Sequence, residues 1–251
     1  MCLIIVAHRA CHRWPLVVAA NRDEEYARPS RRMHRWDDAP DVLGGRDLRE
    51  GGSWLAVTRT RRFAAVTNLR GGEATRFPTS RGTLVRDFVL SNMAPDEYAA
   101  AVVRAGAEYA GFHLLAGVAG ATLAHATNAD GSASILPPGI HGVSNGPPAA
   151  EWAKVSEGKR VMAEVLARGD DAERTTRDLL AFLTTPSDAA RRRGGTARED
   201  LESESFVFGD RYGTRSSSVI LVDAGGEVRF TEQNFRVGGV ADGEVEMIVS
   251  S

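Results

Sequence analysis

The sequence predicts an α+β fold, in the form of a four-layer αββα sandwich built from two antiparallel sheets. Runs rich in β-branched residues and runs with helical spacing are segregated along the chain, in the order strands, helices, strands, helices, strands. This order differs from the strict alternation of strand and helix in a doubly wound sheet. The 251 residues, 43% of them hydrophobic, suffice for one sizeable core, and we predict a single domain over residues 1–251.

The first predicted elements are strands. Apolar runs over residues 3–7 and 16–20, separated by a polar turn, predict a buried hairpin whose second strand leads into Asn21-Arg22-Asp23-Glu24. Residues 25–50 contain many arginines, several prolines and little periodicity, so we expect a long ordered loop there. The next two strands are predicted over residues 54–57 and 63–67.

Helical signals follow these strands. Apolar spacing predicts a helix over residues 83–90, and Pro95-Asp96-Glu97 is typical of the first turn of a second helix. Two more helices are predicted over residues 152–167 and 172–183, and residues 191–204 are expected to form a mobile surface loop. The remaining strands are predicted over residues 112–116, 122–126 and 140–144, and a closing hairpin over residues 217–222 and 227–231.

Composition excludes several classes of protein. The net charge of −2 and the dispersed tryptophans argue against a nucleic-acid partner. No stretch approaches the roughly 18 apolar residues that cross a bilayer, so membrane insertion is not expected. Two cysteines, Cys2 and Cys11, cannot form a disulfide framework, and we expect a cytoplasmic protein. The sequence carries no indication of oligomeric state.

Cys2 is the most informative single residue. Removal of Met1 would place a thiol and a free α-amine on one residue. An amine with a reference pKa of about 8 can accept the thiol proton near neutral pH, and the thiolate is the reactive form of cysteine. The structural alternative is that Cys2 is a small hydrophobic residue at the start of a strand.

Polar clusters interrupt several of the predicted strands. Asn21-Arg22-Asp23-Glu24 follows one strand, Asn68 ends a second, Asn145 follows a third, and residues 213–218 lead into a fourth. A solvated turn explains the tetrapeptide equally well when it is considered alone. The repetition of such clusters at strand ends favours a functional site.

The combination of motifs resembles the NRDE family, also called the transport and Golgi organisation 2 family. The resemblance extends over nearly the whole chain. The matching motifs are Met1-Cys2, Asn21-Arg22-Asp23-Glu24, Arg28-Pro29, Gly44-Gly45-Arg46-Asp47, Gly51-Gly52-Ser53-Trp54, Thr67-Asn68, Ser80-Arg81-Gly82, Tyr109-Ala110-Gly111-Phe112, Gly142-Val143-Ser144-Asn145 and Tyr212-Gly213-Thr214-Arg215-Ser216-Ser217.

That family is similar to the N-terminal nucleophile hydrolases, particularly penicillin V acylase and bile salt hydrolase, which have an αββα sandwich and an N-terminal cysteine. The resemblance implies a cysteine amidohydrolase that cleaves a non-peptide C–N amide bond through a thioester and requires no cofactor. Cys2 would be the nucleophile, and Arg22 and Asp23 would hold and polarise it. Asn145 would donate to the oxyanion, Asn68 is a second candidate donor, and Arg215 would contact the nucleophile's surroundings.

A carrier protein is the rival interpretation, because the family is implicated in haem trafficking and in the handling of acyl-CoA or lipids. The same pocket would then bind haem or acyl-CoA, with Arg22, Arg46 or Arg215 pairing carboxylates or phosphates. Haem iron could be bound by Cys2 or by one of the histidines His8, His12, His34, His113, His125 and His141. The sequence has no zinc-type cluster, and we predict no metal site. The predicted ligand-binding residues are Asn21, Glu24, Arg46 and Trp54.

Overall fold

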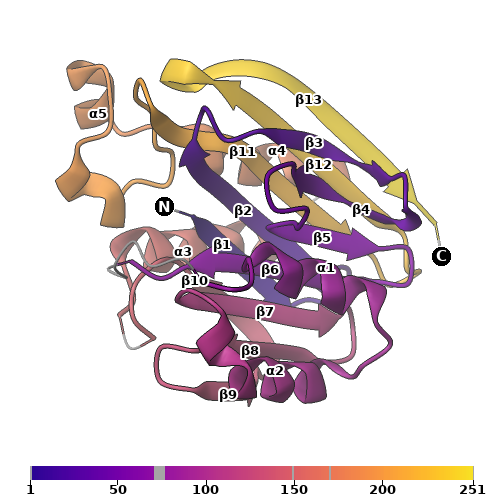
Figure 1. Ribbon diagram of the computed structural model, residues 1–251. Helices are drawn as coiled ribbons and strands as arrows, with labels where there is room; N and C mark the ends of the chain where they lie inside the picture. The colour runs from indigo at the N-terminus through magenta and orange to yellow at the C-terminus, as the bar shows by residue number, and fades with distance from the viewer. Residues whose placement is uncertain (1, 71–76, 149, 170, 251) are drawn as a thin grey trace.

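Four layers make up the protein, as the computed structural model shows for residues 2–70, 77–148, 150–169 and 171–250 (Figure 1). Two antiparallel sheets face each other across a hydrophobic core, and helices cover the outer face of each sheet. The predicted α+β sandwich is therefore confirmed.

The first sheet, called sheet A, has six strands and contains both the N-terminal strand and the last strand. In spatial order its strands are β10 (Gly139–Val143), β1 (Leu3–His8), β2 (Leu16–Glu25), β11 (Tyr212–Val222), β12 (Val228–Arg236) and β13 (Val240–Val249). Sheet B has seven strands that follow one another in chain order: β3 (Ser30–Trp36), β4 (Ala39–Asp47), β5 (Leu55–Thr58), β6 (Arg62–Asn68), β7 (Phe112–Val118), β8 (Leu123–Thr127) and β9 (Ser132–Ile135).

The helices divide between the two outer faces. The α-helices are α1 (Gly82–Leu90), α2 (Pro95–Arg104), α3 (Ala153–Ala167), α4 (Ala172–Thr184) and α5 (Asp188–Arg193), and the short 3₁₀ helices are η1 (Gly106–Glu108), η2 (Arg198–Glu202) and η3 (Val237–Gly239). Helices α1 and α2 pack on sheet B, and α3 and α4 pack on sheet A (Figure 1). Helix α1 buries Leu84, Val85 and Phe88 on one face, as its helical spacing predicts.

Strand β1 shows why its sequence is apolar at every position. Successive side chains point to opposite faces of a strand. Ile4 and Val6 therefore enter the core between the sheets, whereas Leu3 and Ile5 pack under the outer helices. A strand buried on both faces has no polar face to alternate with, and a continuous apolar run results.

The prediction of a loop over residues 25–50 was wrong, because most of this segment forms the β3–β4 hairpin at one edge of sheet B. Met33 and Trp36 are buried there, and arginines occupy the exposed positions. Register shifts between Arg31 and His34 and between Arg35 and Trp36 break the two-residue period. Bulges of this kind hide the alternation that identifies a strand.

The prediction of a mobile loop over residues 191–204 was also wrong, since α5 and η2 occupy much of this segment. The Ser187 side chain caps α5 by accepting from Ala190 N, and Gly194 ends the helix with a φ of 72°. Ala190 is the buried residue of this short helix, so no apolar period was visible. Strands β9 and β13 were not predicted, because most of their side chains are at least partly exposed.

No helix in the described part of the chain is both long and apolar enough to cross a membrane.

The core between the sheets should dominate stability, and Phe63 is fully buried within it. Phe63→Ala should lower the free energy of unfolding by about 3–5 kcal/mol, because the truncation removes apolar contacts and leaves a cavity. Leu48→Ala is the control, since Leu48 is 60% exposed, and it should change stability by less than about 0.5 kcal/mol. Urea unfolding followed by circular dichroism measures both, and equal values would contradict this assignment of the core.

Candidate functional site

The Asn21-Arg22-Asp23-Glu24 tetrapeptide lies inside β2, which corrects the prediction that it follows a strand. Its residues pair with β11, where Asp23 lies opposite Thr214 and Arg22 opposite Ser216. The register shift between Thr214 and Ser216 leaves Arg215 as a bulged residue. Because strand side chains alternate, Arg22 faces sheet B, whereas Asn21 faces the helices outside sheet A.

Cys2 immediately precedes β1. It lies in a small cavity between the two sheets that we call the Cys2 pocket. Its Sγ lies 3.8 Å from the carbonyl oxygen of Asp23 and donates a weak hydrogen bond to it. Burial raises the pKa of the Cys2 thiol, and the nearby Asp23 carboxylate adds to this effect. The pocket has a volume of about 90 Å³ and is lined by Cys2, Arg22, Asp23, Glu24, Arg28, Asp47, Ser53, Trp54, Val66, Asn68, Ser80, Arg81 and Gly82.

Asp23 is held by β11. Thr214 Oγ1 donates to Asp23 Oδ1 at 2.7 Å, and the Tyr212 hydroxyl donates to the Asp23 carbonyl oxygen at 3.1 Å. The same carbonyl accepts from Cys2, so β11 fixes the backbone group that orients the thiol. Burial raises the pKa of the Tyr212 hydroxyl, which therefore stays protonated as a donor.

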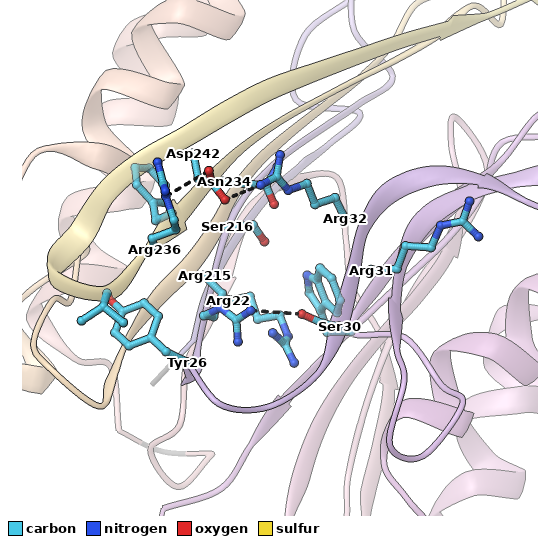
Figure 2. A pocket seen from close by; sticks show the side chains of 13 residues that line it. Arg22, Tyr26, Ser30, Arg31, Arg32, Arg215, Ser216, Asn234, Arg236 and Asp242 are labelled. Atoms are coloured by element: carbon cyan, nitrogen blue, oxygen red, sulfur yellow. Dashed lines mark hydrogen bonds and ion pairs between the residues drawn. The ribbon is translucent and has the colours of Figure 1, made fainter.

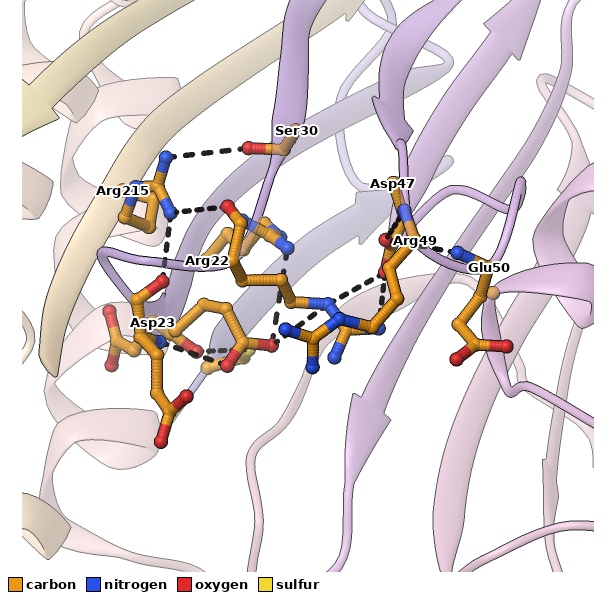
Figure 3. Close-up of polar contacts among 12 residues, drawn as sticks. Arg22, Asp23, Ser30, Asp47, Arg49, Glu50 and Arg215 are labelled. Carbon is orange, nitrogen blue, oxygen red and sulfur yellow. Dashed lines mark hydrogen bonds and ion pairs between the residues drawn. The ribbon is translucent and has the colours of Figure 1, made fainter.

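Arg22 is a buried cation, with only 6% of its surface exposed. Its guanidinium carbon lies 4.4 Å from the centre of the Trp54 ring, and its Nη2 lies 4.0 Å from Glu24 Oε2. Its Nη1 has no hydrogen-bond partner within the described residues. Figure 3 shows this guanidinium between the β11 side of the site, marked by Arg215, and the side marked by Asp47. A buried, incompletely paired guanidinium favours an anionic ligand or a developing negative charge beside it.

The two candidate oxyanion donors have different positions. Asn68 ends β6 and lines the Cys2 pocket. Asn145 lies behind it, and its Nδ2 donates to the Asn68 carbonyl oxygen at 2.6 Å. The neighbouring Ser144 Oγ donates to the Cys2 carbonyl oxygen at 2.7 Å. Asn68 thus lines the pocket, and the amide nitrogen of Asn145 holds the Asn68 backbone.

Two predicted ligand-binding residues lie apart from the Cys2 pocket. The Asn21 side chain donates to the carbonyl oxygens of Leu183 and Ser205, both at 2.7 Å. The Arg46 guanidinium stacks on Trp36, with 3.7 Å from its carbon to the ring centre, and pairs with Asp38. The geometry does not bring Asn21 or Arg46 to the thiol, whereas Glu24 and Trp54 line its pocket.

Several pocket residues were not singled out from the sequence. Arg28 donates through Nε to Asp47 Oδ2 at 2.8 Å, and Arg81 donates to the Gly111 carbonyl oxygen at 3.0 Å. Arg28, Asp47 and Arg81 lie within motifs that carry the family resemblance, so that resemblance could have identified them. Lys154 has no such signal, yet it is 1% exposed and interacts electrostatically with Asp23 and Cys2. A lysine in the first turn of a helix ordinarily faces solvent.

Figure 2 shows a second cavity, which we call the arginine pocket. It adjoins the Cys2 pocket, since Arg22 and Trp54 line both. Arg215 lies here and donates from Nη1 to the carbonyl oxygens of Glu25 at 2.9 Å and Arg28 at 3.1 Å. The pocket measures about 430 Å³ and is lined by Arg22, Tyr26, Ser30, Arg31, Arg32, Trp54, Arg215, Ser216, Asn234, Phe235, Arg236, Val237 and Asp242. Arginines thus outnumber acids in a chain whose net charge is −2.

Among the described residues, no histidine lines either of these two pockets. His113, His125 and His141 line a third cavity of about 300 Å³ beside β10. Within the described ranges, no group of three or more histidine, cysteine, aspartate or glutamate side chains is arranged to hold a metal ion. The chemistry available at the Cys2 pocket therefore comes from a thiol, guanidinium groups, carboxylates and amides.

Comparison with known proteins gives a family match over most of the chain. The family described as Transport and Golgi organisation 2 matches residues 1–237. The Bos taurus Transport and Golgi organization protein 2 homolog is 34% identical over 237 residues, which cover 87% of this chain and 86% of that protein. The Homo sapiens homolog is 31% identical over 237 residues with the same coverage, and the Drosophila melanogaster protein is 30% identical over 247 residues, covering 88% and 86%.

Solved structures of hydrolases share the fold. The C2A mutant of conjugated bile acid hydrolase from Clostridium perfringens is similar with a TM-score of 0.54 and 8% identity, covering 98% of this chain and 92% of that chain. Penicillin V acylase from Agrobacterium tumefaciens is similar with a TM-score of 0.54 and 12% identity, covering 91% and 82%. At these identities the likeness establishes the architecture and leaves the activity to be argued from the site.

Because burial raises its pKa, the Cys2 thiol should react slowly with iodoacetamide at neutral pH while Met1 is still attached. The thiolate is the reacting form, so the rate should keep rising with pH through the ordinary thiol pKa of about 8.5. Mass spectrometry of the Cys2 peptide measures the rate, with the Cys11 peptide as an internal reference. A rate that reached its plateau below about pH 8 would contradict the raised pKa.

Proposed function

The chain belongs to the Transport and Golgi organisation 2 family, and from this premise we propose that it is a cysteine amidohydrolase of the N-terminal nucleophile type. Its substrate is a small molecule with a non-peptide C–N amide bond. The observation that carries the proposal is the polar pocket at the start of β1, which Cys2 lines together with Arg22, Asp23 and Asn68. Its two free cysteines are compatible with a reducing cytoplasm, where we place this chemistry.

The reaction begins with removal of Met1, which exposes the α-amine of Cys2. This amine accepts the proton from Sγ, and the resulting thiolate attacks the carbonyl carbon of the amide. The C–N bond then breaks, the departing nitrogen takes the proton, and the acyl group remains on Sγ as a thioester. Water hydrolyses the thioester, which releases the carboxylic acid and restores the thiol.

The surrounding residues oppose the pKa elevation that burial imposes. The α-ammonium, once it belongs to Cys2 itself, and the Arg22 guanidinium both favour the thiolate. The Asp23 carbonyl oxygen, held by Tyr212, orients the sulfur toward the pocket. Asn68 lines the pocket, and in this proposal it donates to the oxyanion, an interaction whose removal in other enzymes costs about 2.7–4 kcal/mol.

The fold neighbours support this choice of nucleophile. The Clostridium perfringens hydrolase is a C2A mutant, so a cysteine at its second position was replaced. This chain also has cysteine as its second residue. Penicillin V acylase and conjugated bile acid hydrolase are named for acylase and hydrolase activities, which is the class of chemistry that we propose here.

The arginine pocket favours a second candidate function, the carriage of an anionic ligand such as haem or acyl-CoA. Its arginines are held in place, since Asp242 pairs with both Arg32 and Arg236 and backbone carbonyls bind Arg215. The unpartnered Arg22 Nη1 belongs to a residue that lines the same cavity. These groups suit carboxylates or phosphates, which guanidinium groups bind through charge-assisted hydrogen bonds.

Intact mass spectrometry tests the amidohydrolase proposal. We expect purified protein to lack the mass of one methionine and to gain a single acyl adduct from a thiol-directed acylating probe. The adduct should be absent from Cys2→Ala and retained in Cys11→Ala, because Cys2 lines the pocket and Cys11 does not. Hydrolysis of amide substrates should fall at least about 100-fold in Cys2→Ala, since the covalent route is lost. Retained Met1 without a selective adduct would overturn the proposal.

Calorimetric titration with haemin and with octanoyl-CoA tests the carrier function. Wild-type protein is used for haemin, because Cys2 is a candidate iron ligand, and the Cys2→Ala protein is used for octanoyl-CoA. The double variant Arg32→Gln and Arg236→Gln should weaken binding about tenfold, because charge-assisted hydrogen bonds are lost. Arg59→Gln is the matched control, since Arg59 is exposed, pairs with Asp41 and lies outside the arginine pocket. Equal affinities in the two variants would exclude the arginine pocket as the binding site.

A further inference from the structure

His113 and His125 form a hydrogen-bonded pair beside the Ser144–Gly146 segment, with His113 buried and His125 partly buried. The segment, residues 144–146, connects the end of β10 toward α3 and carries both Ser144 and Asn145. We propose that this histidine pair is a positioning element of the Cys2 site, which holds the segment so that Asn68 and Cys2 keep their relative placement. The proposal rests on the amidohydrolase function proposed above.

Hydrogen bonds and the peptide links of residues 144–146 connect the pair to the backbone carbonyls of Asn68 and Cys2. His113 Nδ1 lies 3.0 Å from His125 Nε2, and His113 Nε2 donates to the Gly146 carbonyl oxygen at 2.8 Å. The next residues back along the chain are Asn145, which donates to the Asn68 carbonyl, and Ser144, which donates to the Cys2 carbonyl. The pair thus acts on the pocket through two groups that touch it.

The histidine pair lies where it can connect the two sheets. His113 is on β7 and His125 on β8, and they share the inner face of sheet B with Leu115 and Leu123. The Ser144–Gly146 segment directly follows β10, the edge strand of sheet A. The hydrogen bond to Gly146 therefore ties one sheet to the other beside the site, and His113 is only 4% exposed.

The hydrogen bonds also determine the protonation state. A carbonyl only accepts, so His113 carries its proton on Nε2, and its Nδ1 accepts from His125 Nε2 in the neutral pair. Burial lowers the pKa of His113 and lowers that of His125 to about 4. The other charged or titratable groups facing the pair are Asp130, His141, Glu151 and Lys159.

Acid should therefore weaken the hydrogen bond between the two histidines, and with it the hold of the pair on the Ser144–Gly146 segment. When both rings are protonated, the two nitrogens that meet at 3.0 Å both carry hydrogen, and neither can accept. A folded-state pKa below the unfolded value means that the neutral pair is favoured by folding. Stability falls as the pH drops below the unfolded histidine pKa of about 6.5, and the loss levels off below the folded pKa.

Two reactions of Cys2 separate positioning from reactivity. Acylation by p-nitrophenyl acetate passes through an oxyanion and depends on the donor geometry, whereas alkylation by iodoacetamide has no oxyanion. His113→Leu should lower the acylation rate about tenfold, because small misplacements at a site are costly, and should leave the alkylation rate within about twofold. His113→Gln retains a donor toward Gly146 and should restore most of the acylation rate.

His141→Gln is the matched control, because His141 lines the same cavity but bonds to the Pro137 carbonyl oxygen. It should change neither rate. Hydrogen exchange of a peptide covering residues 139–146, which ends before the two prolines that lack amide hydrogens, gives a readout that is independent of catalysis, and it should be faster in His113→Leu. Unchanged acylation together with unchanged exchange would overturn the positioning role, as would an equal loss of both rates. If iodoacetamide alkylates Cys2 of the wild-type protein but p-nitrophenyl acetate never acylates it, the amidohydrolase function is overturned. Faster hydrogen exchange in His113→Leu would in that case still support the positioning role of the histidine pair.

Discussion

The antiparallel pairing of β1 with β2 on one side and β10 on the other is the constraint on which the site depends. Leu3 lies opposite Asn21 and Ile4 opposite Val143, so the start of β1 meets both the tetrapeptide strand and the Ser144–Gly146 segment. A shift of one residue in either register would exchange the two faces of the strand. Because both faces of β1 are buried, such a shift would force both the core between the sheets and the layer beneath the outer helices to repack, and this packing fixes Cys2 between the two polar segments.

At the site, burial of the Cys2 thiol and the Arg22 guanidinium costs free energy, and neighbouring groups offset this cost only in part. A buried thiol favours its neutral form, and a buried guanidinium such as Arg22 is stable only with aromatic, anionic or ligand partners. Arg22 belongs to both pockets, so a charged ligand in the arginine pocket would alter the field at the sulfur. The proposed catalysis and the proposed anion binding thus share one side chain, which explains why the two candidate functions are difficult to separate by sequence alone.

Much of the fold was accessible from the sequence, because continuous apolar runs and helical spacing report burial directly. The β1–β2 and β11–β12 hairpins and α1 to α4 were predicted close to their observed positions. The failures share one physical cause, which is that the signal in those segments is not hydrophobic. The β3–β4 hairpin has bulges and exposed arginines, α5 is defined by its caps, and most side chains of β9 and β13 are at least partly exposed.

The sequence by itself determined the chemical identity of the site, since a cysteine at the second position, the tetrapeptide and the asparagines at strand ends are visible as residues in order. Only the tertiary structure decided which of them meet. The strict alternation of strand side chains turned Asn21 away from Arg22, and the packing of sheet B against sheet A put Asn68 at the pocket with Asn145 behind it. Lys154 and the His113–His125 pair acquired their positions from contacts between distant segments, and no local pattern in a sequence encodes such contacts.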